Sequence, residues 1–231
     1  MERMKNIKTD LIPSLEESLF QPSGNITDIL ADIIEIGFDS DLQDGIFKEI
    51  PVIRMIAGLT KVGFAIRDRI MMVKTAHFLQ AFHNDTIDPV LLEKHRKELE
   101  QNPRKAEQEL SRVIILLDRA IEEIQAKHLG AFYRNHINER INWEQFVELS
   151  EANDRLFLAD LSLLEKIAVS PIKENEELSP QIKYQIERLR SLGMVIEGYN
   201  ILDAGTFDNW ESPRDYMAAS SFGKLFVTMK E

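Results

Sequence analysis

The chain has 231 residues, of which 44% are hydrophobic and 29% charged, a balance that excludes an intrinsically disordered protein and predicts a folded one. Cysteine is absent, which excludes disulfides, thiolate nucleophiles and metal sites ligated by sulfur, and favours a reducing compartment. The formal net charge of -11 argues against general attraction to nucleic acid. The first ten residues are polar and charged, so we expect no signal peptide and a cytoplasmic protein.

Two short helices are predicted near the N-terminus. Ser14 and Glu17 have the spacing of a capping box, in which each side chain satisfies a backbone N–H group, so a helix is expected to start there. From Thr27 to Ile36 the apolar residues follow a helical repeat. The repeat stops at Gly37, a residue that accepts the left-handed conformation at a helix end, which predicts a second helix.

The segment from Ile50 to His83 is the most hydrophobic part of the chain, and it is also basic. Five basic residues stand there against one acid, a net charge of +4. These basic residues are Arg54, Lys61, Arg67, Arg69 and Lys74. A membrane-spanning helix needs about 20 largely uncharged residues, so the charges within and after this apolar run exclude a simple span.

Two interpretations of this segment remain. In the first it is the central core helix of the domain, and the charged ends of its long side chains reach the surface. In the second it contacts an anionic membrane surface or a protein partner, and the protein is then peripheral at the inner membrane face. The contacts in the second interpretation are Arg54, Lys61, Arg67 and Arg69.

Proline and asparagine signals mark the helices that follow. Asp88 and Asn102 each stand before a proline, an N-cap residue followed by a favoured first helical residue, which predicts helices over residues 89–101 and 103–137. Asn142 and Gln145 form a further capping box, which begins a helix extending from residue 143 to about 169. Its apolar residues fall on more than one face, which indicates burial on several sides.

The polar stretch Ser170–Glu177 has the composition of a connector, so we expect two domains, residues 1–169 and 170–231. Beyond it, Ser179 and Pro180 begin a helix that reaches Leu192 and ends at Gly193. Residues 194–196 and 216–218 are expected to form strands, and residues 222–229 a closing helix. The predicted fold class is therefore mainly α, a multi-helix bundle with a small α+β unit at the C-terminus.

Two stretches near the end of the chain carry a resemblance to known folds. The sequence Ile186-Glu-Arg-Leu-Arg-Ser-Leu-Gly-Met-Val-Ile196, followed by Tyr216-Met-Ala-Ala-Ser-Ser-Phe-Gly-Lys-Leu-Phe226, resembles the end of a winged-helix domain, over residues 179–229. Together with Ala126-Lys-His-Leu-Gly-Ala-Phe-Tyr133 and residues 146–164, the order of these parts is similar to the bacterial abortive-infection alpha family. The resemblance implies a helical protein linked to phage resistance, and it brings no catalytic residues.

No motif for catalysis or metal binding is present in the sequence. The five histidines lack metal-ligand spacing, and no glutamate stands three residues before any of them, as helical di-iron sites require. Phosphate-binding loops and nucleophile elbows are also absent. Asp154 lies among apolar residues, where an unpaired charge is costly, so we expect it to pair with Arg119 or Arg155. We therefore expect no cofactor, no metal and no enzymatic activity.

Three modes of binding remain as functional hypotheses. The first is contact with a protein or a membrane surface, in a phage-defence or stress setting that the resemblance alone supplies. The second is a winged-helix regulator that binds DNA, although residues 169–231 carry a negative net charge. The residues offered to a nucleic-acid or protein surface are Lys183, Arg188 and Arg190. The third is a homo-oligomer formed through exposed apolar faces of the long helices.

Overall fold

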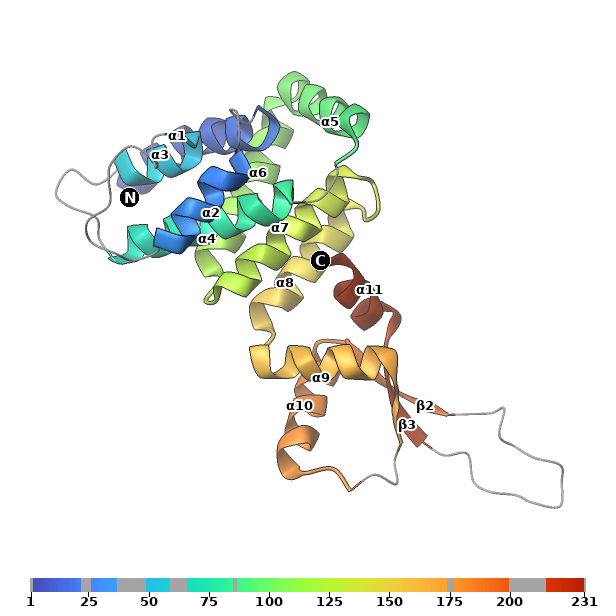
Figure 1. Cartoon of the computed structure of the whole chain (residues 1–231). Coiled ribbons are helices and arrows are strands. Elements are labelled where there is room, and N and C mark those ends of the chain that lie inside the picture. The colour runs from blue at the N-terminus through green and yellow to red at the C-terminus, as the bar shows by residue number, and fades with distance from the viewer. Residues whose placement is uncertain are drawn as a thin grey trace, which may run out of the picture. The chain divides into compact units, whose positions relative to one another are not determined.

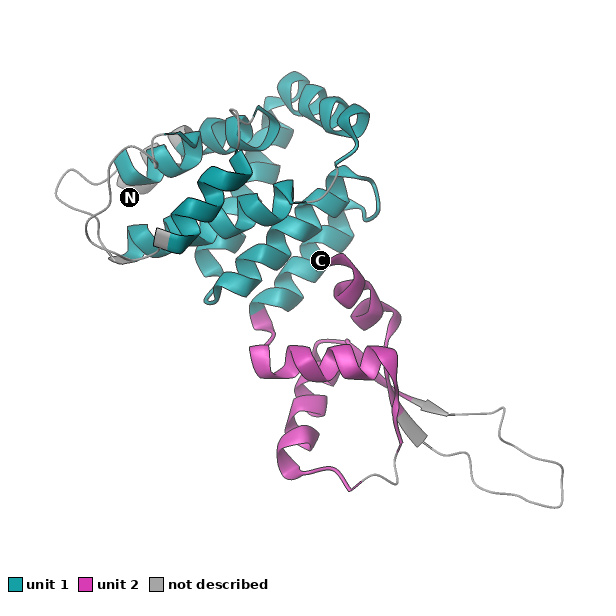
Figure 2. Cartoon of the chain, viewed as in Figure 1, with its two compact units in different colours: residues 1–154 teal, residues 155–231 magenta. Residues whose placement is uncertain are grey.

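The computed structural model describes residues 2–21, 26–36, 49–58, 66–84, 87–173, 177–199 and 215–230. These residues are mainly helical, with a small antiparallel sheet near the C-terminus (Figure 1). The chain divides into two compact units, residues 1–154 and 155–231 (Figure 2). None of the described helices is long and apolar enough to cross a membrane.

The first unit is built from helices. Their bounds are α1 Glu2–Phe20, α2 Ile26–Ile36, α3 Pro51–Gly58, α4 Ile66–His83, α5 Pro89–Gln101, α6 Pro103–Arg119, α7 Glu123–Ile137 and α8 Trp143–Arg155. Helix α4 contacts α1, α2, α3, α6 and α7, and its closest partner is α7. The two backbones meet at Gly130, where a Cβ atom would lie 2.2 Å from the carbonyl oxygen of Phe78. Only glycine allows this approach.

Aromatic rings fill the core between these helices. Phe78, Phe82, Phe132, Tyr133 and Phe146 are all fully buried. Adjacent rings lie at centroid distances of 5.5 to 6.4 Å, in tilted, stacked and edge-on arrangements that aromatic pairs favour. The core of the first unit therefore lies along the α4–α7 pair.

The N-terminal helix begins earlier than the sequence predicts. Helix α1 runs through Pro13, so the expected start at Ser14 is wrong, whereas α2 ends at Ile36 as predicted. Gly37 lies outside the described residues. Within α1 the Ser18 hydroxyl donates to the carbonyl oxygen of Ser14 at 2.8 Å and accepts from the Val52 N–H at 3.1 Å, which joins α1 to the start of α3.

The predicted helix over residues 103–137 is in fact two helices. Helix α6 ends at Arg119, because Ala120 has an extended conformation with a ψ of 127°. The Gln125 side chain then accepts hydrogen bonds from the N–H groups of Ile121 and Glu122, at 2.8 and 3.1 Å, and so caps the start of α7. The predicted N-caps Asp88 and Asn102 are confirmed, each accepting from backbone N–H groups of its helix.

The predicted helix over residues 143–169 also breaks. Asn142 and Gln145 form the expected reciprocal capping box at the start of α8, with bonds of 3.0 and 2.8 Å. Phe157 then has a ψ of 138°, and α9 Leu158–Val169 follows. Helix α9 contacts α10, α11 and β3, so the boundary between the units lies at residues 154 and 155, earlier than the expected 169 and 170.

The second unit combines helices with the sheet. After α9 come β1 Ile172–Lys173, α10 Pro180–Ser191, β2 Val195–Tyr199, β3 Asp215–Ala219 and α11 Ser221–Met229. The strand order is β1-β3-β2, with both pairs antiparallel. The predicted helix before Gly193 is confirmed, and Gly193 has the left-handed φ of 71°. Strand β1 lies in the stretch that the sequence presents as a connector.

Candidate functional site

Most of the apolar residues that the structure describes in the basic segment belong to the core. Residues 72–79 of α4 are all buried, and so are Val52, Ile53 and Ile56 of α3. Residues 72–79 are thus buried on all sides and leave no apolar face for a membrane or a partner. This burial supports the interpretation of the described part of Ile50–His83 as a core segment.

The basic side chains of this segment lie in different environments. Lys74 is buried, and its Nζ atom donates to the carbonyl oxygens of Asp118 and Ala120, at 3.1 and 2.8 Å, where α6 ends. Arg67 is exposed and donates to both carboxylate oxygens of Asp118, at 3.0 and 3.1 Å. Lys74 thus compensates the negative end of the α6 dipole and its unsatisfied carbonyl groups, whereas Arg67 neutralises the Asp118 carboxylate.

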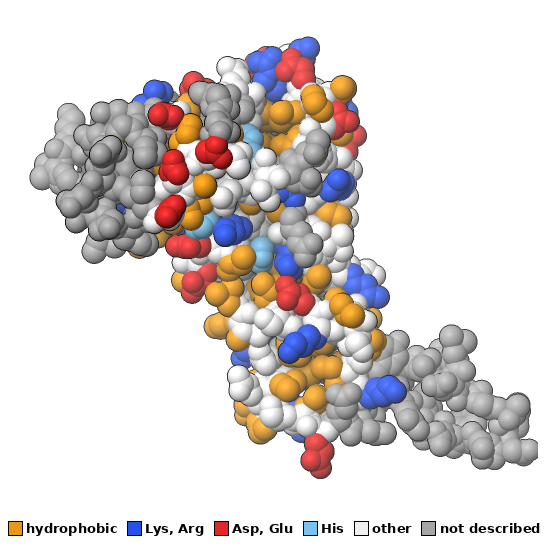
Figure 3. All heavy atoms as spheres, viewed as in Figure 1, with side chains coloured by type: hydrophobic (Ala, Val, Ile, Leu, Met, Phe, Trp, Pro, Cys, Tyr) orange, Lys and Arg blue, Asp and Glu red, His pale blue; other side chains and the backbone are white. Residues whose placement is uncertain are grey.

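The other basic residues proposed as contacts are not seen to share one surface in the described part of the chain. Arg54 is exposed on α3, Arg69 is half-buried on α4, and Lys61 lies outside the described residues. On the face shown in Figure 3, acidic and basic side chains are interspersed. The assignment of Arg54, Arg67 and Arg69 to a membrane or partner contact stays a prediction.

Two of the three cations of α10 are held within the second unit. The Arg188 guanidinium donates to both oxygens of the buried Asp160 carboxylate, at 2.7 and 2.5 Å, and lies 4.9 Å from the Phe157 ring centroid. Arg190 forms an ion pair with Glu197 at 2.6 Å. Lys183 is exposed. The outward charge of α10 is therefore smaller than its sequence indicates.

Large hydrophobic side chains are exposed in both units but are concentrated in the second. Of the nine that are exposed among the described residues, five lie in residues 155–231. These five are Phe157, Leu158, Val169, Tyr184 and Ile196. Figure 3 shows hydrophobic side chains at the surface of this unit. A partner that covered these side chains would remove their apolar area from water.

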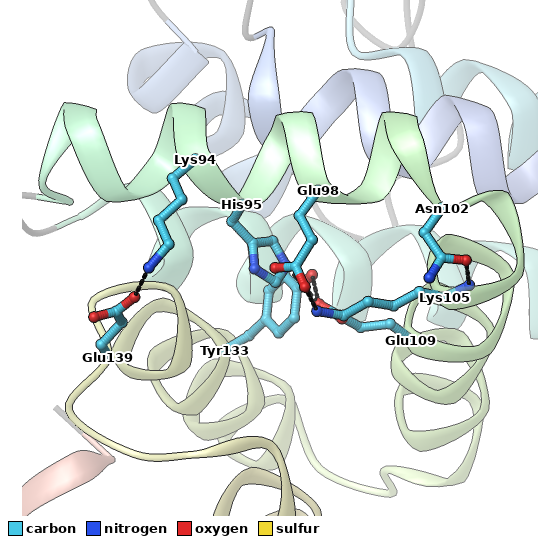
Figure 4. A network of polar contacts seen from close by, with 8 residues as sticks. All are labelled: Lys94, His95, Glu98, Asn102, Lys105, Glu109, Tyr133 and Glu139. Atoms are coloured by element: carbon cyan, nitrogen blue, oxygen red, sulfur yellow. Dashed lines mark hydrogen bonds and ion pairs between the residues drawn. The ribbon is translucent and has the colours of Figure 1, made fainter.

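A buried polar cluster lies between α5, α6 and α7. Glu109 is only 3% exposed, and its Oε1 atom accepts a hydrogen bond from His95 Nε2 at 2.7 Å and another from the Tyr133 hydroxyl at 2.7 Å. Figure 4 shows the rings of His95 and Tyr133 beside the Glu109 carboxylate, with the Glu98–Lys105 ion pair near them. His136 is the fourth member, with its ring centroid 5.6 Å from that of His95.

The electrostatics of this cluster follow from its burial. Burial alone would raise the pKa of Glu109, but the hydrogen bond and charge of His95 and the Tyr133 hydroxyl outweigh it, so that this pKa is lowered. Burial and the neighbouring Glu109 carboxylate raise the pKa of Tyr133 well above its usual value. Burial lowers the pKa of His136. The cluster therefore holds an ionised carboxylate beside a protonated phenol.

A second polar connection joins α7 to α8. The Gln125 amide donates to the carbonyl oxygen of Asn153, and the Asn153 amide donates to that of Gln125, both at 2.9 Å. His128 Nδ1 lies 2.9 Å from Asn153 Oδ1. The expected ion pair between Asp154 and Arg119 is present beside this connection.

Sequence reasoning missed the buried cluster because its members are far apart in the chain. His95 and Glu109 are 14 residues apart, and Glu109 and Tyr133 are 24 apart. One signal was available: Glu109 stands three residues after Ala106 and four before Val113, on the apolar stripe of α6. A carboxylate on such a stripe indicates a buried partner.

The chain matches no known protein-family model, and no curated protein or solved structure is significantly similar to it.

Proposed function

We propose that this chain is a non-enzymatic binding protein that contacts a protein partner through its second unit. One observation carries the proposal: five large hydrophobic side chains are 43 to 87% exposed on a unit of 77 residues. Leaving such groups in water costs about 25 cal/mol for each Å² of apolar surface, and a partner that covers them recovers this free energy. Aromatic residues are enriched at the centres of protein interfaces.

Helix α10 fits a protein partner better than a nucleic acid. Tyr184 is 68% exposed beside Lys183, whereas Arg188 is engaged by the buried Asp160. A tyrosine ring gives a large contact area at a small cost in conformational entropy. We therefore propose Tyr184 as the central contact of this surface.

Affinity capture from the source cells with three forms of the chain tests this proposal. The wild-type chain should retain a defined partner, and Tyr184→Ser should lose it. Val90→Ser is the matched control, because Val90 is 74% exposed on the first unit and its loss should leave capture unchanged. Equal capture by wild type and Tyr184→Ser would show that the second unit is not the contact surface.

A second copy of the chain is one alternative partner. Light scattering distinguishes it, because a monomer has a mass of 26.7 kDa. If the partner is a different protein, the isolated chain should scatter as a monomer. A dimer that dissociates in Tyr184→Ser would identify the partner as a second copy.

A winged-helix regulator is the second candidate function, and the sheet favours it. The strand order β1-β3-β2, with α10 before the β2–β3 pair, agrees with the resemblance of residues 179–229 to a winged helix. Lys183 is then the nucleic-acid contact, since Arg188 and Arg190 are paired with acids. We expect no duplex binding in a gel-shift experiment at low salt. Binding that Lys183→Ala weakens would favour this candidate instead.

We also propose a phage-defence or stress setting, which rests on the resemblance to the abortive-infection alpha family. In a bacterial host the wild-type chain should lower the number of phage plaques, and Tyr184→Ser should restore it. Liposome flotation with anionic lipid tests the membrane alternative separately. Flotation that depends on Arg54 or Arg67 would move the contact surface to the first unit.

A further inference from the structure

We propose that His95, Glu109 and His136 form a binding site for a divalent transition-metal ion, Zn²⁺ being the best fit. Each residue offers one ligand atom, and these three atoms all lie within 4.8 Å of one another. They come from α5, α6 and α7, so an ion bound here joins three helices of the first unit. Two imidazole nitrogens and one carboxylate oxygen are a ligand set that Zn²⁺ uses, with a water in the remaining position.

The groups around the site orient the ligands. His136 Nδ1 lies 3.3 Å from the carbonyl oxygen of Ile141, which can only accept a hydrogen bond. Nδ1 must therefore carry the hydrogen, and Nε2 keeps its lone pair for a metal. The Tyr133 hydroxyl donates to Glu109 Oε1. Metal-binding histidines and carboxylates are held by such partners in most known sites.

The burial of Glu109 makes this place favourable for a cation. An ionised carboxylate that is 3% exposed requires a compensating positive charge or hydrogen-bond donors. Without metal, the N–H of His95 supplies the donor at 2.7 Å. When Zn²⁺ binds, His95 Nε2 must turn a lone pair to the ion, so the neutral ring gives up the hydrogen on Nε2 and takes one up on Nδ1, with no net release of a proton.

Binding also requires a small contraction of the cluster. Bonds of about 2.0–2.2 Å to one ion bring ligand atoms to about 3–3.5 Å from each other. The three atoms are within 4.8 Å, so the side chains have to close by about 1–2 Å at most. Rotations of the side chains can supply such a movement without a change of helix packing.

The first experiment uses the full chain after removal of metal with EDTA. Titration with Co²⁺ should give the absorption bands of a four- or five-coordinate ion with one equivalent bound. Calorimetry with Zn²⁺ should give a binding heat that saturates at one equivalent. A wild-type chain that gives neither the Co²⁺ bands nor a stoichiometric Zn²⁺ heat would overturn the proposal without any variant.

Variants then place the ion. Glu109→Gln and His136→Gln should each weaken Zn²⁺ binding by about 100-fold or more, and Tyr133→Phe by about 10-fold. His77→Gln is the matched control, because His77 Nε2 pairs with Glu123 at 2.9 Å in the same unit. The affinity of His77→Gln for Zn²⁺ should equal that of the wild-type chain. Unchanged binding in both Glu109→Gln and His136→Gln, with circular dichroism showing folded chains, would overturn the site.

Discussion

His83 is a half-buried ring whose titration should affect stability. Its Nε2 atom lies 3.1 Å from the Ser18 carbonyl oxygen, and burial lowers its pKa although this hydrogen bond acts in the opposite direction. A lowered pKa means that the unfolded state takes up the proton first as the pH falls below 6.5. Acid therefore destabilises the folded state. The contribution of the neutral His83 ring to the free energy of unfolding is fully present only above pH 6.5.

We predict that the free energy of unfolding in urea, measured with EDTA, falls between pH 7.5 and pH 5.5, and falls less in His83→Gln. Glutamine keeps an N–H donor for Ser18 but does not titrate. The pKa of His77 is also lowered by burial, so His77 contributes to the same loss of stability in acid. His83→Gln should therefore reduce this loss without removing it. The same loss in both proteins would show that His83 does not contribute.

Arg188 gives a prediction on stability in the second unit. Removal of its guanidinium leaves the Asp160 carboxylate, 1% exposed, without its ionic partner. Arg188→Ala should therefore lower the denaturation midpoint clearly. Lys183→Ala, on the exposed face of the same helix, should leave it within error. If the two variants unfold alike, the Arg188–Asp160 pair is not structural.

At the scale of single residues, the sequence predicts contacts where the chemistry leaves few choices. The Asp154–Arg119 pair is an example. A carboxylate among apolar residues needs a cation, and Arg119 was one of two arginines expected as its partner. The burial of Glu109 could be inferred from its place on the apolar stripe of α6, but its partners His95 and Tyr133 could not, since they depend on which helices pack together. Spacing along one helix carries no information on that packing.

At the scale of elements, Gln125 is expected to stabilise the α6–α7 and α7–α8 connections. Its side chain accepts from two N–H groups and donates to the Asn153 carbonyl while only 5% exposed. Gln125→Met should lower the free energy of unfolding by about 3 kcal/mol, because buried donors and acceptors lose their partners. Urea denaturation monitored by circular dichroism measures this change.

Gln145→Met is the control for that prediction. Gln145 accepts from the Asn142 N–H in an exposed capping box, so the same substitution should cost about 0.5–1 kcal/mol. Equal costs at the two positions would mean that the hydrogen bond of Gln125 to Asn153 of α8 contributes nothing beyond capping.

Capped helix starts were predicted, whereas breaks inside a helical pattern were not. The N-caps Asp88, Asn102, Asn142 and Ser179 are local signals, and each begins a helix as expected. The breaks after Arg119 and Arg155 carry no glycine or proline. At the break after Arg119, Lys74 of α4 binds the carbonyl groups of Asp118 and Ala120. Such tertiary contacts leave no pattern in the segment itself.

At the scale of the whole molecule, the mainly helical class and the C-terminal sheet strands followed from periodicity and turn residues. Whether Ile50–His83 lies in the core or at the surface could not be predicted, because an apolar arc with basic residues suits both a core and a membrane surface. Only the packing of α4 against five other helices of the first unit places its apolar residues inside. The division at residues 154 and 155 likewise depends on packing, since α9 contacts elements that follow it.

The division into two units predicts that a defect in one leaves the other folded. Gly130→Ala would put a Cβ atom 2.2 Å from the Phe78 carbonyl oxygen, and Gly223→Ala would put one 2.1 Å from that of Met194. No rotation relieves a clash with backbone, so each change should cost about 3 kcal/mol. Gly58→Ala meets nothing within 4 Å and should lie within about 1 kcal/mol of wild type.

Hydrogen exchange measured by mass spectrometry separates the two defects. Gly130→Ala should speed exchange in peptides of residues 1–154, and Gly223→Ala in peptides of residues 155–231, each with little effect on the other unit. This localisation is expected because Gly130 and Phe78 lie in one unit, and Gly223 and Met194 in the other. Faster exchange throughout the chain in either variant would mean that the two units unfold as one cooperative body.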